Sequence, residues 1–429
     1  MTARARLLLA LTILSAFNQL DRQLTAILLE PIRREFALSD VELGLLSGLA
    51  FAVLYAGLSL PAAIWAMHYG RRTLVAVSAA VWGLATIASG LAQSFGQLLL
   101  GRIGIGAGEA GVTPAAHAMI SDSYPPHERA SAMATWSSGV NIGVFLAFLV
   151  GSYVGHRYGW RTAFVACGVA TVLAAIAVRI GVAEPPRTRD RETEALRGIP
   201  SLGLLALTVR IMWRDPALRH TVIGATITAT VGYGAISWVP SFLVRVHGLD
   251  LATTGTYLAL VIGVGGATVV TLGGRLADRL HRHGIGWSLG AIGLWLLIVK
   301  PFALVFYLTS STAVALTVFV LPATAANAYL GPALAVLHGG VPPTLRPAAS
   351  AVFLIAVNLI GLGVGPLIVG ALSQWVFADA GPRSLGNALA LMQALGAWGA
   401  LHVLLAARAL VRRPPAPGLS VRPDPRAGP

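Results

Sequence analysis

Charged residues are scarce in this sequence. Only 11% of its 429 residues are Asp, Glu, Lys or Arg, whereas 56% are hydrophobic. An ordinary soluble domain carries roughly a quarter of charged residues, so this chain has too few of them to cover a water-exposed surface. The composition therefore excludes an ordinary soluble protein and indicates a polytopic membrane protein.

Cysteine is almost absent as well. Cys167 is the single one, so an intramolecular disulfide is excluded. The sequence also lacks a paired-histidine metal motif, a Gly-x-Ser-x-Gly nucleophile elbow and paired carboxylates in a soluble domain. These absences argue against a membrane-embedded enzyme, and we expect neither a metal nor another cofactor. A sensor that binds without transporting stays open as an alternative.

Long apolar runs are what the sequence has instead. A membrane-spanning helix needs about 20 apolar residues, and about twelve such runs can be marked. The basic start of the first run could belong to a signal peptide, but no small-residue cleavage site follows it, so a retained first helix is predicted. The runs lie near 7–29, 42–67, 73–93, 98–120, 130–154, 160–182, 218–244, 252–273, 286–307, 311–336, 348–372 and 385–410.

The formal net charge of +14 would suit a nucleic-acid partner. The positions of the arginines argue against such a partner, because about twelve spans place most of them on one side of the membrane. The positive-inside rule makes that side cytoplasmic, with both chain termini inside. The exceptions are Arg33, Arg34, Arg157, Arg161 and Arg245, and acidic residues such as Glu30, Glu35 and Asp250 lie near several of them in the sequence.

The fourth apolar run contains an arginine and a glutamate. Because charges at membrane depth cost at least a few kcal/mol, Arg102 and Glu109 mark a functional-site hypothesis. An ion pair that only holds two helices together stays open as the alternative. At helical spacing one face carries Arg102, Gly106, Glu109, Thr113 and His117, and another, suited to close helix packing, carries Gly104, Gly108, Gly111 and Ala115.

The first apolar run also contains two charges, Asp21 and Arg22. They lie roughly 20 Å from its cytoplasmic end at about 1.5 Å per residue, and the fourth run, which is antiparallel, brings Arg102 to the same level. Adjacent residues cannot share a helix face. We therefore expect Asp21 to pair with Arg102 and Arg22 with Glu109, the arrangement that leaves no buried charge alone.

Two repeated motifs indicate that the chain consists of two related halves. Pro125-Pro-His-Glu-Arg129 precedes the fifth run and Pro342-Pro-Thr-Leu-Arg346 precedes the eleventh, and Asn141 and Asn358 follow at the same spacing. Glycines recur in both of these runs, as at Gly143 and Gly365. Such spacing predicts a flexible interface between halves, with a lipid site as the alternative.

The loop Gly273-Gly274-Arg275-Leu-Ala-Asp278-Arg279 resembles the signature that joins helices 8 and 9 in the major facilitator superfamily. Its amino-terminal counterpart, Met67-His68-Tyr-Gly70-Arg71-Arg72, has Met67 and His68 where the signature has Asp and Arg. The resemblance implies that these loops latch the conformation. The latch residues would be Gly70, Arg71, Gly274, Asp278 and Arg279.

This resemblance covers nearly the whole chain and implies an all-α polytopic membrane protein with the major facilitator fold. It implies 12 transmembrane helices in two six-helix halves, related by a parallel repeat. The halves would be 1–182 and 217–411, joined by a cytoplasmic linker at 183–216 and followed by a disordered cytoplasmic tail at 412–429. Spans 1, 4, 7 and 10 would line the central cavity.

A narrower resemblance rests on Asn18-Gln-Leu-Asp21-Arg22 together with Arg102-Ile-Gly-Ile-Gly-Ala-Gly-Glu109. The combination is similar to the Spinster branch, whose animal members export sphingosine-1-phosphate or lysophospholipids. It implies proton coupling at Asp21 and Glu109 and headgroup binding at Arg22 and Arg102. The other candidate substrate residues are Asn18, Thr113, Asn141, Thr230, Tyr233, Trp238 and Asn358.

The predicted function is proton-coupled secondary transport, by alternating access, of an amphiphilic and anionic lipid-like substrate. A lysophospholipid or a sphingoid phosphate is the expected type, and small organic anions or hydrophobic drugs are the alternative. Expected partners are the substrate, protons and membrane lipid, without nucleic acid. We expect a monomer in the inner membrane of a bacterium.

Lys300 is the only lysine and precedes Pro301 in the ninth run. The superfamily resemblance places this span at the periphery. The side chain is therefore expected to extend toward a membrane interface, with a role in the substrate site as the alternative.

Overall fold

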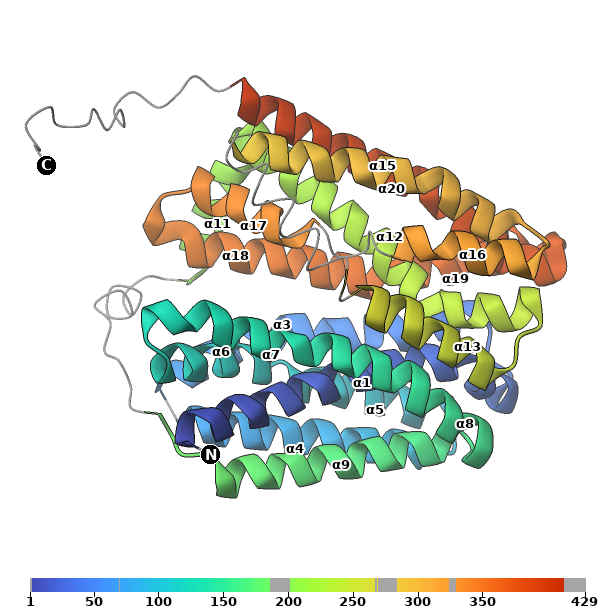
Figure 1. Cartoon of the computed structure of the whole chain (residues 1–429), viewed down its shortest axis with the longest axis horizontal. Coiled ribbons are helices and arrows are strands. Elements are labelled where there is room, and N and C mark those ends of the chain that lie inside the picture. The colour runs from blue at the N-terminus through green and yellow to red at the C-terminus, as the bar shows by residue number, and fades with distance from the viewer. Residues whose placement is uncertain are drawn as a thin grey trace, which may run out of the picture.

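A computed structural model describes residues 2–68, 70–185, 201–266, 268, 284–323 and 329–412, which are helical and contain no strand. Figure 1 shows two groups of helices, one coloured blue to green and the other yellow-green to red. The first consists of α1 (Ala3–Phe36), α2 (Asp40–Gly44), η1 (Leu45–Leu49), α3 (Ala50–His68), α4 (Arg71–Gly90), α5 (Phe95–Glu109), α6 (Val112–Ser123), α7 (Pro126–Leu146), η2 (Ala147–Gly151), α8 (Ser152–Tyr158) and α9 (Trp160–Gly181).

The second group begins after a stretch that includes residues 186–200, which lie outside the described residues. The predicted tail, apart from residue 412, also lies outside them. The second group consists of α11 (Ser201–Arg214), α12 (Pro216–His247), α13 (Leu251–Leu258), η4 (Ala259–Gly265), α15 (Ile285–Leu308), α16 (Thr312–Ala323), α17 (Leu330–Gly340), η5 (Pro343–Leu345), α18 (Arg346–Ile355), η6 (Ala356–Val364), α19 (Gly365–Ala371), η7 (Leu372–Val376), η8 (Ala378–Arg383) and α20 (Ser384–Val411).

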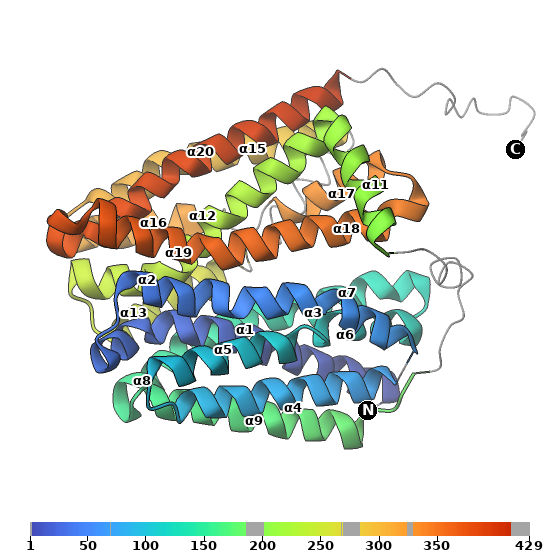
Figure 2. The same cartoon turned by 180° about the vertical axis from the view of Figure 1, so that it is seen from behind.

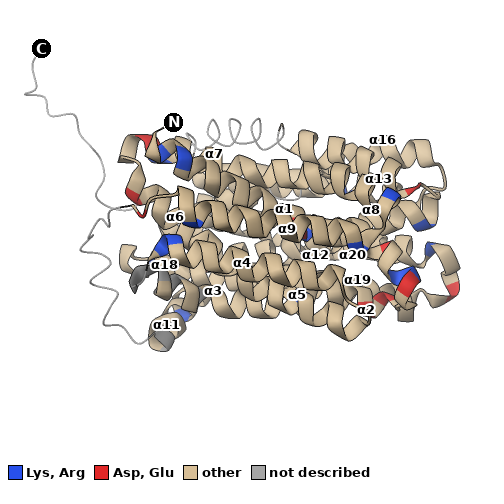
Figure 3. Cartoon of the chain, turned by 90° about the horizontal axis from the view of Figure 1, so that it is seen from below, with Lys and Arg blue, Asp and Glu red and all other residues tan. Residues whose placement is uncertain are grey.

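The helices form an apolar belt between two charged ends. Eight of the described helical stretches are long and apolar enough to cross a membrane by length and composition alone. Charged residues gather at the two ends of the helices, with a long apolar zone between them (Figure 3). The chain termini of both groups lie at one end, which we call the terminus end, and we call the opposite one the far end (Figure 1). The sequence prediction of a polytopic, all-α fold is confirmed.

The fourth span is interrupted, which the sequence analysis did not predict. α5 ends at Glu109 and α6 begins at Val112. Pro114 explains the break, because a proline has no N–H to donate and its ring collides with the carbonyl four residues earlier. That carbonyl belongs to Ala110, where the regular helix stops.

Glycines let α5 and α6 pack closely on α4. A Cβ atom on Gly108 would lie 2.5 Å from the backbone nitrogen of Trp82, and one on Gly104 would lie 3.1 Å from Ala85. The predicted close-packing face is confirmed at these positions. Gly106, which the helical spacing placed on the polar face, instead packs against the backbone of Phe51 in α3.

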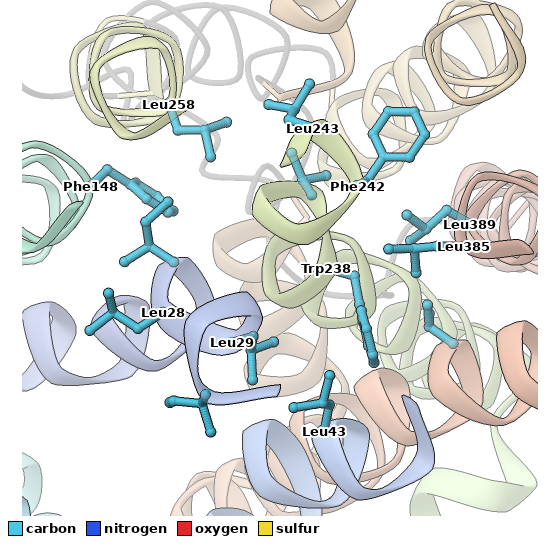
Figure 4. Close-up of a cluster of buried hydrophobic side chains, with 14 of the residues drawn as sticks. Leu28, Leu29, Leu43, Phe148, Trp238, Phe242, Leu243, Leu258, Leu385 and Leu389 are labelled. Atoms are coloured by element: carbon cyan, nitrogen blue, oxygen red, sulfur yellow. The ribbon is translucent and has the colours of Figure 1, made fainter. Parts of the chain in front are cut away.

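The two groups meet through a buried apolar cluster at the far end, which we call the far-end cluster. Figure 4 shows Leu29 and Leu43 of the first group next to Trp238 of α12, while Leu28 lies on the side of Phe148. Figure 2 shows α2 lying along α19, where a Cβ on Gly44 would approach the carbonyl oxygen of Pro366 to 2.7 Å. Burial of these side chains holds the halves together on this side.

Polar contacts between the groups lie at the far end too. Arg245 of α12 reaches across to Glu30 and Asp40, with both N–O distances at 2.6 Å. The Ser373 hydroxyl donates to Asp40 at 2.6 Å, and the Val41 amide donates to the Gln374 side chain at 3.0 Å. These contacts, which we call the far-end gate, complete the junction that the apolar cluster begins.

The arginines that were exceptions to the positive-inside pattern mostly form ion pairs with acidic residues. Arg33 pairs with Glu30 at 2.7 Å, and Arg161 pairs with Glu35. Asp250 instead caps α13 by accepting from the Thr253 hydroxyl at 2.6 Å and the Thr253 amide at 2.9 Å. These two hydrogen bonds hold the pKa of the Asp250 carboxyl below its ordinary value.

Candidate functional site

Four charged side chains meet inside the first group of helices. Arg22 of α1 donates to Oε2 of Glu109 on α5 through Nη2 at 2.8 Å and through Nε at 2.9 Å. Nη1 of Arg102 lies 3.7 Å from Oδ1 of Asp21. The two predicted pairs, Asp21 with Arg102 and Arg22 with Glu109, are confirmed.

The pairs differ in their access to solvent. Asp21 and Glu109 are 0% exposed and Arg102 is 2% exposed, whereas the side chain of Arg22 is 15% exposed. A buried ion pair is stable only where the geometry and additional hydrogen bonds offset desolvation. Arg22 is thus the member of the cluster that a ligand can reach.

Asp21 is held by a third helix. Its Oδ2 atom accepts from the Trp82 indole N–H and from the Thr86 hydroxyl of α4, both at 2.6 Å. Hydrogen bonds to a charged acceptor are the strong kind. Sequence reasoning missed both residues, although their four-residue spacing puts them on one helix face.

Several atoms of the cluster have unused hydrogen-bonding capacity. Among the described residues, Oδ1 of Asp21, Nε and Nη1 of Arg102, and Oε1 of Glu109 are buried without a hydrogen-bond partner. Buried polar atoms in proteins are nearly always bonded. The cluster can therefore take up a proton, or a further polar group, without first breaking an existing bond at these atoms.

Aromatic rings of α3 lie against the guanidinium groups. The central carbon of Arg22 lies 4.7 Å from the Phe51 ring centroid and 4.5 Å from that of Tyr55. Arg102 lies 5.5 Å from the Phe51 ring. Such cation–π contacts stabilise a guanidinium in a place with few waters. Neither aromatic residue was among the sequence candidates.

Some of the remaining candidates lie around this cluster. Asn18 is one turn before Arg22 on α1, and its buried Nδ2 has no hydrogen-bond partner among the described residues. Tyr233 of α12 comes from the other half and packs on the apolar cluster that contains Phe51 and Tyr55. The others are partly buried on their own helices, Thr113 in α6, Asn141 in α7 and Asn358 in η6.

Two candidates on α12 are engaged elsewhere. The Thr230 hydroxyl donates to the Thr226 carbonyl of its own helix at 2.8 Å. Trp238 is 0% exposed, donates its indole N–H to the Pro366 carbonyl at 2.9 Å, and belongs to the far-end cluster. The structure does not bring Trp238 to the charged cluster.

The residues predicted for the first latch contact carboxylates that lie outside the loop motif. Arg71 forms an ion pair with Asp122 of α6. The backbone amides of Arg71 and Arg72, at the start of α4 after Gly70, donate to Glu184 at 2.7 and 2.9 Å. A carboxylate at a helix amino terminus is favourably placed. The second predicted latch, at Gly274, Asp278 and Arg279, lies outside the described residues.

Lys300 does not extend toward an interface, contrary to the sequence expectation. Its ammonium donates to Oε1 of Gln393 on α20 at 3.2 Å. On α15 it shares a face with the buried Ala303 and Tyr307, while Phe302 lies exposed. The helix therefore directs Lys300 into the second group, where its ammonium reaches the Gln393 side-chain amide and not a membrane interface.

Comparison with known proteins agrees with this fold. Residues 11–366 match the profile of the Major Facilitator Superfamily. The chain is 31% identical over 387 residues to an MFS-type efflux pump of Mycolicibacterium smegmatis (strain ATCC 700084 / mc(2)155), covering 90% of this chain and 88% of the pump. A probable L-galactonate transporter of Escherichia coli (strain K12) is 27% identical over 290 residues, covering 65% of this chain and 62% of that protein.

A solved structure matches the chain nearly end to end. It is the crystal structure of a bacterial homologue of the human lysosomal transporter Spinster, in an inward-facing and unoccupied conformation. The TM-score is 0.83 at 29% sequence identity, covering 97% of this chain and 100% of the other. With this fold and a family match over most of its length, the chain belongs to the major facilitator superfamily, whose members are membrane transport proteins and not enzymes.

Proposed function

We propose that this protein is a proton-coupled secondary transporter of an amphiphilic anion, with a lysophospholipid or a sphingoid phosphate as the expected type. The observation that carries the proposal is the Arg22–Glu109 pair, in which a fully buried carboxylate holds an arginine that solvent can reach. Such a pair can couple a proton to a ligand. A proton competes with Arg22 for the Glu109 carboxylate, and an anionic ligand competes with Glu109 for the Arg22 guanidinium.

Protonation of Glu109 is the proposed coupling step. A neutral carboxyl no longer attracts the guanidinium of Arg22, which at present directs Nε and Nη2 to one oxygen. The freed guanidinium can then bind an anionic headgroup with two parallel hydrogen bonds. Loss of the proton would restore the ion pair and release the headgroup. Asp21 and Arg102 form a second pair in which protonation has the same effect.

The surroundings of Arg22 favour an amphiphile. Phe51 and Tyr55 give the guanidinium an aromatic neighbourhood, and Tyr233 adds another ring from the opposite half. A substrate with one charged end and an apolar body would meet both kinds of surface. The similarity to a bacterial Spinster homologue agrees with the sequence resemblance from which this class of substrate was expected.

We infer that the terminus end is cytoplasmic and that this conformation faces inward. The described ion pairs and hydrogen bonds between the halves lie at the far end, through Arg245 and Ser373. The excess of arginines near the terminus end follows the positive-inside rule. The related structure is also inward-facing.

The second candidate substrate is a small organic anion. An accessible arginine can bind any carboxylate, and the related protein from Escherichia coli is named as a probable transporter of a sugar acid. The two candidates share the anionic group and differ in the apolar body. A binding screen that includes lysophospholipids, sphingoid phosphates and sugar acids separates them by thermal shift.

Transport in liposomes tests the coupling. An imposed pH gradient should drive substrate accumulation by the wild-type protein, and Glu109→Gln should lower this accumulation by about tenfold or more, the effect of losing about 1.4 kcal/mol. Asp21→Asn should also impair it. Glu128→Gln, which changes an exposed carboxylate (50% exposed), is the control. Normal coupling in both Glu109→Gln and Asp21→Asn would contradict the proton role.

A further inference from the structure

A cavity of about 90 Å³ lies inside the second group of helices. It is partly open and is lined by residues of α12, η4, α15, α16 and α20, all of which belong to the second group (Figure 1). Most of its lining is apolar, for example Val299 and Phe319. The polar members of the lining are Thr228, Lys300, Tyr307 and Gln393.

No carboxylate of this half can neutralise Lys300 within the membrane. From residue 216 to the end, the sequence has four acidic residues, Asp250, Asp278, Asp379 and Asp424, and all lie between or beyond the apolar runs. In the part of the chain that the structure describes, Lys300 takes part in no ion pair of 4.0 Å or less. A buried charge without a counter-ion is strongly unfavourable.

The polar groups at the cavity have donors that the described residues leave unused. The ammonium has three N–H groups, and the described residues accept one of them, through Gln393. The amide nitrogen of Gln393 donates away to the Leu389 carbonyl at 3.2 Å. The hydroxyl of Thr228, which is 7% exposed, has no hydrogen-bond partner among the described residues. A negatively charged acceptor at the cavity could take hydrogen bonds from the ammonium and from this hydroxyl and would also supply the counter-charge of Lys300.

We propose that this cavity binds a small monovalent anion, with Lys300 as its counter-ion and Thr228 as a second donor. One water takes about 30 Å³ of liquid volume, so a cavity of about 90 Å³ has room for a chloride or a short carboxylate such as formate. The bound anion neutralises the ammonium and gives the donors their acceptor.

This site is separate from the Arg22–Glu109 cluster. Its polar residues come from α12, α15 and α20, whereas the cluster comes from α1 and α5 of the other half. The proposal does not depend on the transported substrate or on proton coupling. It is therefore tested by binding and not by transport.

Thermal unfolding of the purified full-length protein tests the site. Chloride replaces gluconate, a much larger anion, at constant ionic strength. Formate replaces gluconate in a second arm. Because a ligand that binds only the folded state stabilises it, the wild-type melting temperature should rise and saturate with the anion that fits. The anion whose stabilising effect saturates at the lower concentration, chloride or formate, is the one that the cavity binds more tightly.

Lys300→Met should abolish the saturable rise. If that variant does not fold, Gly396→Ala provides the test, since a Cβ atom at this position would contact Nζ of Lys300 and displace it while keeping its charge. The concentration for half-saturation should then rise about tenfold, as expected for about 1.4 kcal/mol, near the value of one hydrogen bond to a charged group.

Ser288→Ala is the matched control, because Ser288 is buried on the same helix α15 but does not line the cavity. It should keep the wild-type anion dependence. The proposal is overturned if neither chloride nor formate gives a saturable rise in the wild type. It is also overturned if Lys300→Met or Gly396→Ala keeps the wild-type dependence.

Discussion

Trp82 and Thr86 illustrate how neutral side chains shape a charged site. Both donate to the same carboxylate oxygen of Asp21, so they fix the direction in which its other oxygen faces Arg102. The charges themselves were predictable, since a charge in an apolar run needs a partner at the same depth. The residues that orient them were not, because a tryptophan or threonine in an apolar run looks like any other lipid-facing or packed side chain.

Trp82→Phe isolates one of these hydrogen bonds. The substitution keeps an aromatic ring and removes the N–H that Asp21 accepts at 2.6 Å. Loss of a hydrogen bond to a charged, buried acceptor should destabilise the protein by about 1.5–3 kcal/mol, measured by unfolding in detergent. Trp287→Phe, at a site that is 59% exposed, should change little. Equal stability of the two variants would show that the indole N–H does not hold Asp21.

At the scale of elements, α5 is defined by its glycines. The spacing of small residues in the sequence predicted a close-packing face, and α4 packs there against Gly104 and Gly108. The spacing could not show that Gly106 would pack on a second helix. Helical periodicity shows which residues share a face but not which helix packs against that face. The break after Glu109 had a signal in Pro114, whose effect on Ala110 follows from backbone chemistry alone.

Gly108→Ala tests the close approach of α5 and α4. The added Cβ would lie 2.5 Å from the Trp82 backbone nitrogen, so the helices must separate, and overpacking of this kind costs about 1–3 kcal/mol. The melting temperature in detergent should fall. Gly96→Ala is the matched control on the same helix, because its Cβ would have nothing within 4 Å. That control should be neutral or stabilising, since alanine favours a helix over glycine.

If Gly108→Ala were as stable as Gly96→Ala, then α4 and α5 would be free to shift against each other. The predicted role of glycine in their packing would then be wrong. A loss of stability confined to Gly108→Ala would instead locate the constraint at the contact with Trp82.

At the scale of the whole molecule, the far-end gate holds one conformation. Arg245 joins two carboxylates of the first half, Glu30 and Asp40. Several such charges were visible in the sequence as exceptions to the positive-inside pattern. Their partners across the halves could not be derived, because residues 30 and 245 become neighbours only through the packing of the two bundles.

Arg245→Ala should shift the population toward a state that is open at the far end. Removing Arg245 leaves Asp40 without its cation, whereas Glu30 keeps Arg33. An uncompensated charge is strongly unfavourable where it is partly buried, so the junction should weaken. Spin labels at His127→Cys, in the first turn of α7, and at Thr344→Cys, in η5, mark repeat-related positions at the terminus end. They should report shorter distances as that end closes. The buried Cys167 is first replaced by alanine so that it is not labelled.

Arg157→Ala, which removes an exposed arginine of α8, should leave the label distances unchanged. Unchanged distances in Arg245→Ala would mean that the apolar far-end cluster is sufficient to hold the halves together. The gate would then affect only the rate at which the halves separate.

The far-end gate pairs its ions at close range and mostly away from water. Both contacts of Arg245 are 2.6 Å long, and its side chain is 15% exposed against 13% for that of Asp40. At physiological ionic strength, salt screens exposed charges over about 8 Å but screens partly buried pairs much less. The junction of the two halves should therefore hold over a wide range of salt concentrations, so that a change in the surrounding medium alone would not open the far end.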